Sequence, residues 1–306
     1  MPAYPTIQTG ADPIGGLVRG FASTVSSLIT VGAAASYRAH VDRLALSIVL
    51  SAVALVPSPP LLVPELTGRG VQEAAALRTA ALAAASSLAK VADRWVAVGV
   101  AVSDGVVTAD VRGSFAGYGV DVPVSLSPTA TRFDAELALP ALIAGWLRGK
   151  TAPRSEVEVV LVTADGTADD HARVGRDLRK RLDEDDRSWG LLVVGDGAST
   201  LTARAPGSFD DRAGEVQERI DNALAAADPI ALAALDAGLC ADVGVSGLAA
   251  WQTAVGVVAG DRVEPRTLYR EAPFGVGYFV GTWTVVPGEA VSGEAVSGEA
   301  AGGANR

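Results

Sequence analysis

The sequence predicts an α/β fold: a single domain built on a central, mostly parallel or mixed β-sheet with helices on both faces. Short apolar runs of strand length alternate with longer segments of helical periodicity. Apolar residues make up 49% of the chain and aromatic residues only 5%, so small side chains supply most of the core. No interior linker is long enough to divide the alternating region. These observations favour Ala-rich helices packed closely on a sheet of Val and Leu.

The two ends of the chain differ from this pattern. Residues 1–43 carry scattered Gly, Ser and Thr with weak periodicity, and we interpret them either as a dispensable N-terminal extension or as a short helix, 17–37, packed on the domain. Residues 44–286 are the predicted domain. In residues 287–306 the pentapeptide EAVSG repeats in tandem, and such a tract cannot bury enough surface to offset its ordering entropy. We expect it to be a disordered tail.

Each element within the domain follows from a local pattern. The apolar run that ends at Pro57 indicates a buried strand, and apolar residues spaced by three and four after it indicate a helix. A second apolar run leads to Asp104-Gly105, a dipeptide common in hairpin turns, and to a short partner strand. In chain order we expect strands at 47–56, 95–102, 106–111, 157–162, 189–194, 262–270 and 276–286, and helical segments at 71–92, 137–147, 168–182 and 210–260, the last broken near Pro229 and Gly244.

Charge and composition exclude several classes of partner. The formal net charge is −10, which argues against nucleic acid or an anionic membrane surface as partner, because both need a basic footprint. The longest apolar run, 44–56, is too short to span a bilayer. The single cysteine, Cys240, cannot form an internal disulfide and lies in an apolar helical stretch, where we expect it to be a buried small residue. These features predict a cytoplasmic protein.

Polar residues follow three of the predicted strands at their carboxyl ends, where open α/β sheets bind ligands. If these strands are parallel neighbours, the residues converge on one rim of the sheet. Each has an alternative: Ser58 lies between prolines and suits a turn, Asp104 suits a hairpin, and the loop GDGAST lacks the third glycine of a dinucleotide-binding fingerprint. The candidate pocket residues are Ser58, Ser103, Asp104, Asp196, Ser199 and Thr200.

His171 is the candidate catalytic residue. Val174, Leu178 and Leu182 lie three, seven and eleven positions beyond it, so the imidazole is expected on the inward face of its helix. A histidine beside strand-end carboxylates is suited to general acid or base catalysis. The alternative is an ordinary histidine at the start of a helix.

Four stretches resemble the class III extradiol dioxygenases of the LigB-like superfamily. VPSPPLLVPEL is similar to the opening motif of that family, in which a histidine precedes the double proline, and TADDHARVGRDL resembles its histidine-containing helix. LLVVGDGASTL resembles the strand and glycine/serine loop that follow, and APFGVGYFVGTW resembles a closing strand. The resemblance covers residues 47–286 and is strongest to an uncharacterised branch of that superfamily. It implies the α/β fold of those enzymes.

The same resemblance implies an iron site whose ligands this chain lacks. Family members hold Fe(II) with two histidines and a carboxylate, or with three histidines. Carried over, the first ligand falls on Ser58, the second beside Ser103 and Asp104, and a third near 199–201, and none of these positions is a histidine. The family's acid/base histidine falls on His171. We therefore expect no metal and no cofactor.

Three functions follow, in order of preference. The first is a degenerate, non-catalytic relative that keeps the pocket and binds a small molecule or a protein partner. The second is an enzyme with His171 as acid/base, either metal-independent or with a metal held by carboxylates such as Asp104 and Asp196. The third is an extradiol-type oxidoreductase with an atypical iron site. The sequence does not identify the ligand, and its charge excludes nucleic acid and a membrane as partners. A homodimer is possible, because relatives with this fold often form dimers.

Overall fold

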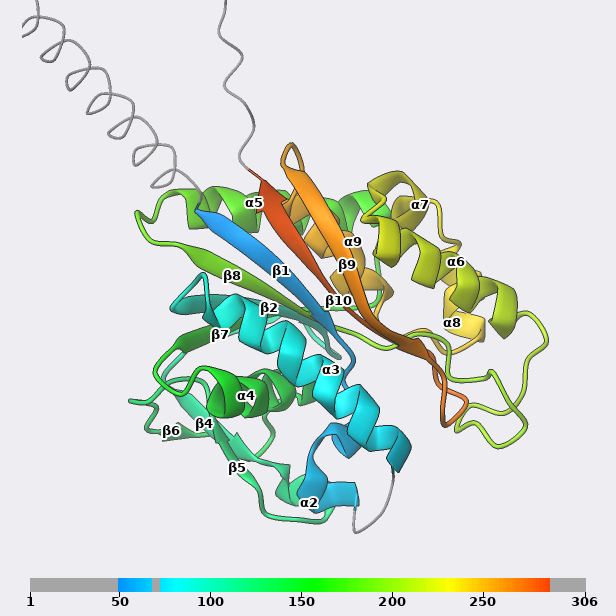
Figure 1. Ribbon diagram of the computed structural model, residues 1–306, viewed down its shortest axis with the longest axis horizontal. Coiled ribbons are helices and arrows are strands. Elements are labelled where there is room, and N and C mark those ends of the chain that lie inside the picture. Colours follow the sequence, from blue (N-terminus) through cyan, green and yellow to red (C-terminus); the bar gives the residue numbers. More distant parts are fainter. Residues whose placement is uncertain (1–48, 68–71, 287–306) are drawn as a thin grey trace, which may run out of the picture. The chain divides into compact units, whose positions relative to one another are not determined.

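A seven-stranded mixed sheet organises the protein in the computed structural model (Figure 1). The structure describes residues 49–67 and 72–286, so the predicted extension, 1–43, and the predicted tail, 287–306, lie outside the described residues. The strand order is β3-β7-β2-β8-β1-β10-β9. These strands are β1 (Leu50–Val56), β2 (Arg94–Val100), β3 (Gly105–Val107), β7 (Glu156–Val162), β8 (Trp189–Val194), β9 (Arg262–Glu271) and β10 (Tyr278–Val286).

The four central strands run parallel to one another, in the order β7, β2, β8 and β1. The outer strands β3, β10 and β9 are antiparallel to their neighbours. The central strands β1, β2 and β8 are largely apolar, as in LLVV of β8, because helices cover the sheet on both faces, whereas β7 begins with the alternating sequence EVEV. The predicted α/β fold with a mixed sheet is confirmed.

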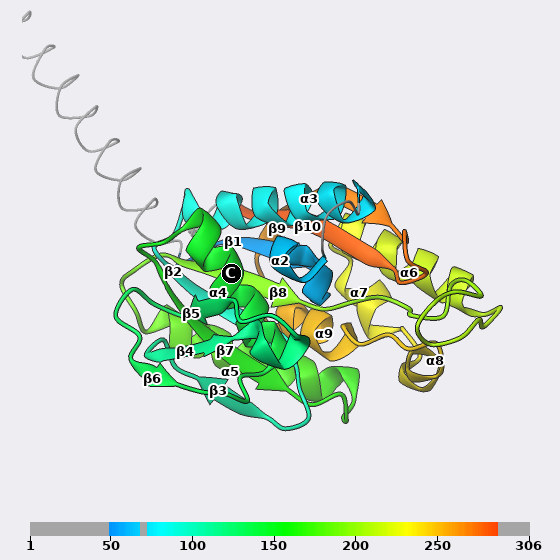
Figure 2. The same ribbon diagram turned by 90° about the horizontal axis from the view of Figure 1, so that it is seen from below.

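Helices lie on both sides of the sheet, as Figure 2 shows. α3 (Gln72–Ala89) and α4 (Leu139–Thr151) cover one face, and α5 (Ala168–Asp183), α6 (Ala213–Ala226) and α9 (Leu248–Val257) belong to the other. No helix within the described ranges is long and apolar enough to cross a bilayer. The remaining helices are η1 (Pro60–Leu62), α2 (Pro64–Thr67), η2 (Phe115–Tyr118), α7 (Pro229–Ala233) and α8 (Ala237–Asp242).

Small residues allow α3 to lie close to the sheet. Ala52 and Ala54 of β1 share one buried cluster with Ala81 and Ala84 of α3. Leu88 reaches over Gly190 of β8, where an added Cβ would come within 3.2 Å of the leucine Cδ2. Close approach of backbones compensates for the small side chains, because interiors are packed at nearly crystalline density. The expected packing of an Ala-rich helix on the sheet is therefore present.

A second, small sheet lies beside α4 and was not predicted. It contains β4 (Val111–Ser114), β5 (Pro123–Ser125) and β6 (Arg132–Phe133), with β4 in the middle. The predicted hairpin between 95–102 and 106–111 is wrong, because β3 pairs with β7 instead of β2. Both sides of β2 are already occupied by its parallel neighbours β7 and β8. The returning chain therefore finds a free strand edge only on the outer side of β7.

α5 buries one stripe of residues against the rest of the fold. Val174, expected on this inward face, is instead 40% exposed, which corrects the prediction. The helix turns the neighbouring Gly175 inward because only a glycine leaves room for the backbone of α9 at this point: an added Cβ would lie 2.0 Å from the Thr253 carbonyl oxygen. The buried residues of α5 are His171, Gly175, Leu178 and Leu182.

Candidate functional site

The carboxyl ends of β1, β2, β7 and β8 meet along one edge of the sheet, because these strands are parallel neighbours. Ser58 follows β1, and Asp196 follows β8. Val56 at the end of β1 pairs with Val194 at the end of β8, so the two loops leave the sheet side by side. The structure thus brings Ser58 and Asp196 together on one rim.

Ser58 and Asp196 form a two-point contact. The Ser58 backbone N–H donates to Oδ1 of Asp196 over 2.8 Å, and the Ser58 hydroxyl donates to Oδ2 over 2.6 Å. Burial raises the pKa of the Asp196 carboxyl above its ordinary value, against the opposing effect of the two hydrogen bonds from Ser58. Ser58 itself is buried. The pair is therefore a desolvated carboxyl held in place by a single neighbouring residue.

One tyrosine, Tyr278, lies close enough to this pair to feel the charge of Asp196, and the sequence reasoning missed it. Tyr278 is buried, and the pKa of its phenol is raised first by burial and then by the negative charges of Asp196 and Tyr269. Tyr278 opens β10, which runs antiparallel to β1, so its amino end reaches the same rim as the carboxyl end of β1. That antiparallel closing strand is the one sequence signal that points to Tyr278.

Ser199 and Thr200 hold the loop after β8 in place. The Ser199 N–H and the Thr200 hydroxyl both donate to the Val243 carbonyl oxygen, each over 3.0 Å. Gly244 has a φ of +73°, and a Cβ there would come within 2.1 Å of Ser199 Oγ. These contacts join the loop to the end of α8. Both residues therefore serve the shape of the loop, and their contacts lie away from Ser58.

Ser103 and Asp104 lie at a different part of the rim, and both are exposed. Asp104 Oδ1 accepts the backbone N–H of Thr163 over 2.6 Å, just after β7. Strand β2 separates β7 from β8, which places the ends of β7 and β8 about 10 Å apart. Asp104 and Asp196 therefore do not share one site. Within the described residues no group of three His, Cys, Asp or Glu side chains is arranged to hold a metal ion.

His171 bridges two helices in the interior. Its Nδ1 lies 2.9 Å from Oε1 of Gln252 in α9, and its Nε2 lies 3.3 Å from the Asp165 carbonyl oxygen. The Gln252 amide donates to the Leu232 carbonyl oxygen over 3.3 Å, which orients its own oxygen toward the imidazole. We therefore assign the Nδ1 proton to a hydrogen bond with Gln252. The side chain is only 6% exposed, and both ring nitrogens face protein acceptors.

Cys240 is buried in α8, as expected from its apolar surroundings. Burial raises the pKa of its thiol to about 11, and the nearby charge of Asp236 adds to this effect. The thiol is therefore protonated at neutral pH and has little nucleophilic character.

A separate cavity of about 700 Å³ lies between the small sheet and α4. Its lining combines cations and aromatic rings, among them Arg112, Phe133, Trp146, Arg148 and Lys150. Sequence reasoning missed this cavity, because one wall is the unpredicted sheet of β4, β5 and β6. It is distinct from the Ser58–Asp196 pair, which does not line it.

Comparisons with known proteins identify no family for this chain. No family model matches it. No curated protein matches it either. One solved structure that is similar to this chain is the crystal structure of an uncharacterized protein from Escherichia coli K12, with 14% sequence identity and a TM-score of 0.48, over 76% of this chain and 99% of the other.

Proposed function

We propose that this protein is a degenerate relative of the class III extradiol dioxygenases that binds a small molecule and does not cleave aromatic rings. The observation that carries the proposal is the Ser58–Asp196 pair. In the resemblance described above, Ser58 takes the position of the first iron ligand. Here its hydroxyl donates a hydrogen bond to the partly buried carboxyl of Asp196, so this position takes part in the protein's own hydrogen bonding.

The residues at the family's ligand positions do not fit Fe(II). A serine hydroxyl is a poor ligand for this ion, which in such enzymes prefers histidine and carboxylate. Ser103 and Asp104 are exposed, and Asp104 accepts a hydrogen bond from Thr163. The segment 199–201 contains no histidine. These positions therefore offer no set of side chains that would hold iron for ring cleavage.

The surroundings of His171 also favour binding over a His171-centred enzyme. A general base needs a nitrogen within hydrogen-bond reach of the substrate proton. Both ring nitrogens of His171 instead face Gln252 and the Asp165 backbone. No carboxylate of the described residues forms an ion pair with the imidazole, so the expected partnership with a strand-end carboxylate lacks support. The cavity beside α4 has a volume typical of small-molecule sites.

A metal-independent enzyme is the second candidate, and one observation favours it. Asp196 is a carboxyl whose pKa is raised by burial, and such a group keeps its proton more readily than an ordinary aspartate, as a general acid requires. Ser58 and Tyr278 would orient it and its substrate. This candidate transfers the acid/base role from His171 to Asp196.

Metal content tests the proposal. Untagged full-length protein is incubated anaerobically with Fe(II), Mn²⁺, Zn²⁺ or Mg²⁺, desalted and analysed by mass spectrometry, and oxygen uptake is followed with catechol. We expect metal well below one equivalent and no oxygen uptake, in the wild type and in Ser58→His alike. Near-stoichiometric iron with oxygen uptake would refute the proposal and revive the atypical dioxygenase. Mg²⁺ retained by the wild type and lost only in Asp196→Asn would favour a carboxylate-metal enzyme, with Asp104→Asn as the matched control.

A further inference from the structure

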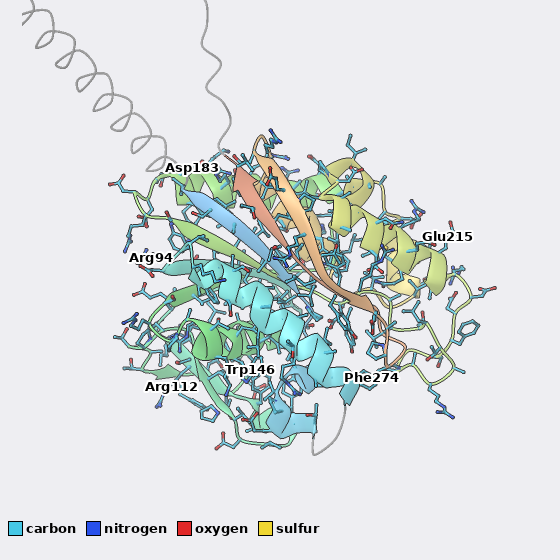
Figure 3. All side chains as sticks on the ribbon, in the orientation of Figure 1. Arg94, Arg112, Trp146, Asp183, Glu215 and Phe274 are labelled. Carbon is cyan, nitrogen blue, oxygen red and sulfur yellow. The ribbon has the colours of Figure 1, made fainter. Side chains whose placement is uncertain are left out.

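The cavity between the small sheet and α4 collects positive charge. Figure 1 shows β4, β5 and β6 lying beside α4, and Figure 3 labels Arg112 and Trp146 in this region. Arg112, Arg148 and Lys150 line the cavity, and within the described residues none of the three is ion-paired. The lining contains one carboxylate, Asp121, which accepts a hydrogen bond from Ser114.

This pattern differs from the rest of the protein. The chain carries a net charge of −10, and many of its arginines are neutralised by neighbouring acids. Arg94 contacts Glu156 and Asp185, for example, and Arg179 contacts two aspartates. An unpaired group of cations in an acidic protein gives the cavity a local positive potential, and potentials of this kind concentrate anions.

Arg148 is the fixed member of the group. It is 5% exposed, and its guanidinium donates to the Ser125 carbonyl oxygen and hydroxyl, both over 2.9 Å, and to the carbonyl oxygens of Pro153 and Ser155 over 2.8 and 3.3 Å. All four partners are neutral, so they orient the cation without cancelling its charge. A guanidinium has five N–H groups. One N–H on Nη2 is thus left without a partner among the described residues.

Aromatic rings lie beside the other two cations, Arg112 and Lys150, and form an apolar part of the cavity wall. The Arg112 guanidinium lies 5.9 Å from the centre of the Phe133 ring, and the Lys150 ammonium lies 6.0 Å from that of Trp146. Phe133 is 57% exposed, which is unusual for a large apolar side chain. The buried indole N–H of Trp146 has no hydrogen-bond partner among the described residues. Charge and flat apolar surface therefore occur together.

We infer that this cavity binds a small organic anion, in which a carboxylate or phosphate group contacts Arg112, Arg148 and Lys150 and a flat apolar body lies against Phe133 and Trp146. The inference rests on the proposed binding function and names its site and ligand class. Arginine favours both kinds of anion, because its planar fork matches carboxylate and phosphate oxygens. A cavity of about 700 Å³ accommodates a molecule with one or two rings.

Calorimetric titration of the full chain at low ionic strength tests the inference. Benzoate represents the carboxylates, phenyl phosphate the phosphates, and benzamide is the neutral control with the shape of benzoate. We expect saturable binding of at least one anion with a Kd of about 1 mM or tighter, weakening as salt is added, and much weaker binding of benzamide. Which anion binds more tightly distinguishes a carboxylate from a phosphate ligand. Equal binding of benzamide, or no saturation by either anion, would overturn the inference.

Variants at exposed positions test the location of the site. Arg112→Ala and Lys150→Ala are each expected to weaken anion binding about threefold, because each removes one partly solvated cation. Arg266→Ala removes an exposed cation from β9, outside the cavity, and is the control of equal charge. Circular dichroism verifies folding. Unchanged affinity in both cavity variants, or an equal loss in Arg266→Ala, would refute the site.

The two proposals fail in distinguishable ways. If neither anion binds while the protein still retains no iron, the site assigned here is wrong and the non-catalytic interpretation stands. If the protein retains iron and consumes oxygen with catechol, the proposed function is wrong. The anion site then no longer has the proposed binding function as support.

Discussion

Asp196 depends on one residue for both of the hydrogen bonds that its carboxyl oxygens accept. The hydroxyl of Ser58 satisfies Oδ2, and the backbone N–H of Ser58 satisfies Oδ1. A buried acceptor that loses its donor keeps the full penalty of desolvation. The contribution of this pair to the free energy of unfolding can therefore be measured by removing the hydroxyl oxygen of Ser58.

Ser58→Ala is expected to lower the free energy of unfolding by about 1–3 kcal/mol, because Oδ2 of Asp196 loses its donor inside the protein. Urea denaturation at neutral pH measures the change. Ser103→Ala makes the same chemical change at an exposed position after β2 and is expected to stay within about 0.5 kcal/mol of the wild type. Equal effects of the two substitutions would show that the Ser58–Asp196 contact contributes nothing to stability.

The raised pKa of Asp196 also predicts a pH dependence. Above the ordinary aspartate pKa of 3.8, the folded state holds this proton more tightly than the unfolded state does. Stability from Asp196 is therefore fully present below pH 3.8 and is lost as pH rises through the folded-state pKa. We expect Asp196→Asn to remove this decline. Unfolding curves at a series of pH values test the point, and parallel profiles for the two proteins would contradict it.

At the scale of elements, α5 and α9 behave as one packed unit. Gly175 of α5 and Gly256 of α9 bring the two backbones together: an added Cβ on Gly256 would lie 2.0 Å from the Ala172 carbonyl oxygen. His171 near the amino end of α5 contacts Gln252 in the middle of α9, and Arg179 donates to the carbonyl oxygen of Val257 at the end of α9. These contacts therefore run along the carboxyl half of α9.

Gly175→Ala is expected to lower stability by about 3 kcal/mol or more, because the added methyl group meets backbone atoms that cannot move aside without separating the helices. Thermal or urea unfolding measures the loss. Gly214→Ala in α6 is the matched control, since nothing lies within 4 Å of the added Cβ, and it is expected to stabilise by up to about 1 kcal/mol. A neutral Gly175→Ala would mean that the two helices are not in close contact.

His171→Ala is expected to lower stability by about 1–3 kcal/mol, because it leaves the Gln252 oxygen unpaired in the interior. Gln252→Ala and the double variant complete a double-mutant cycle, in which we expect a coupling of about 0.5–3 kcal/mol. Binding of the anions that reach the cavity should not change. A loss of ligand binding or activity without a loss of stability would instead assign His171 to a functional site.

Local patterns explain which elements could be predicted. Three of the four central strands, β1, β2 and β8, are mostly apolar, and such runs identify strands buried on both faces of a sheet. The strands β5 and β6 have only three and two residues, contain Pro123 and Arg132, and show no alternation that a sequence pattern could register. The small sheet, and the cavity that it lines, therefore could not be predicted from the sequence and are identified only in the structure.

Some parts of the candidate site could likewise be predicted from the sequence, and others could not. The convergence of Ser58 and Asp196 follows from a general rule about parallel strands. Asp104 does not lie beside Ser58 and Asp196, because it precedes β3, and β3 pairs with the outer edge of β7. The partner of His171 is Gln252, 81 residues away in the chain, and no local signal connects the two.

At the scale of the whole molecule, surface carboxylates and the partly buried Asp196 have opposite effects on stability as the pH changes. The pKa of Asp170 is lowered to about 2, chiefly by the hydroxyl of Thr167, and that of Asp185 is lowered to about 2, chiefly by Arg187. Stability from these two groups is present above their ordinary pKa of 3.8 and is lost as pH falls toward 2.

We therefore expect these two carboxylates to lower the stability of the protein modestly as the pH falls from about 4 to about 2, because both lie at the surface and their interactions are screened by solvent. Equilibrium unfolding at stepped pH, followed by circular dichroism, measures this acid limb. Thr167→Val removes the main cause of the Asp170 shift and should reduce the slope. A slope unchanged by this substitution would show that Asp170 does not contribute to the acid limb.

The two edge strands of the large sheet are poorly suited to pair with a strand of a second copy. In the described part of the chain, β9 forms one end, and its mostly exposed residues include Arg262, Glu264, Arg266 and Pro265, the last without an N–H to donate. At the other end, β3 has only three residues. Charges, a proline and a short strand all resist edge-to-edge pairing. Within the described residues, the two edges of the large sheet therefore disfavour both a continuous intermolecular sheet and fibrous growth from them.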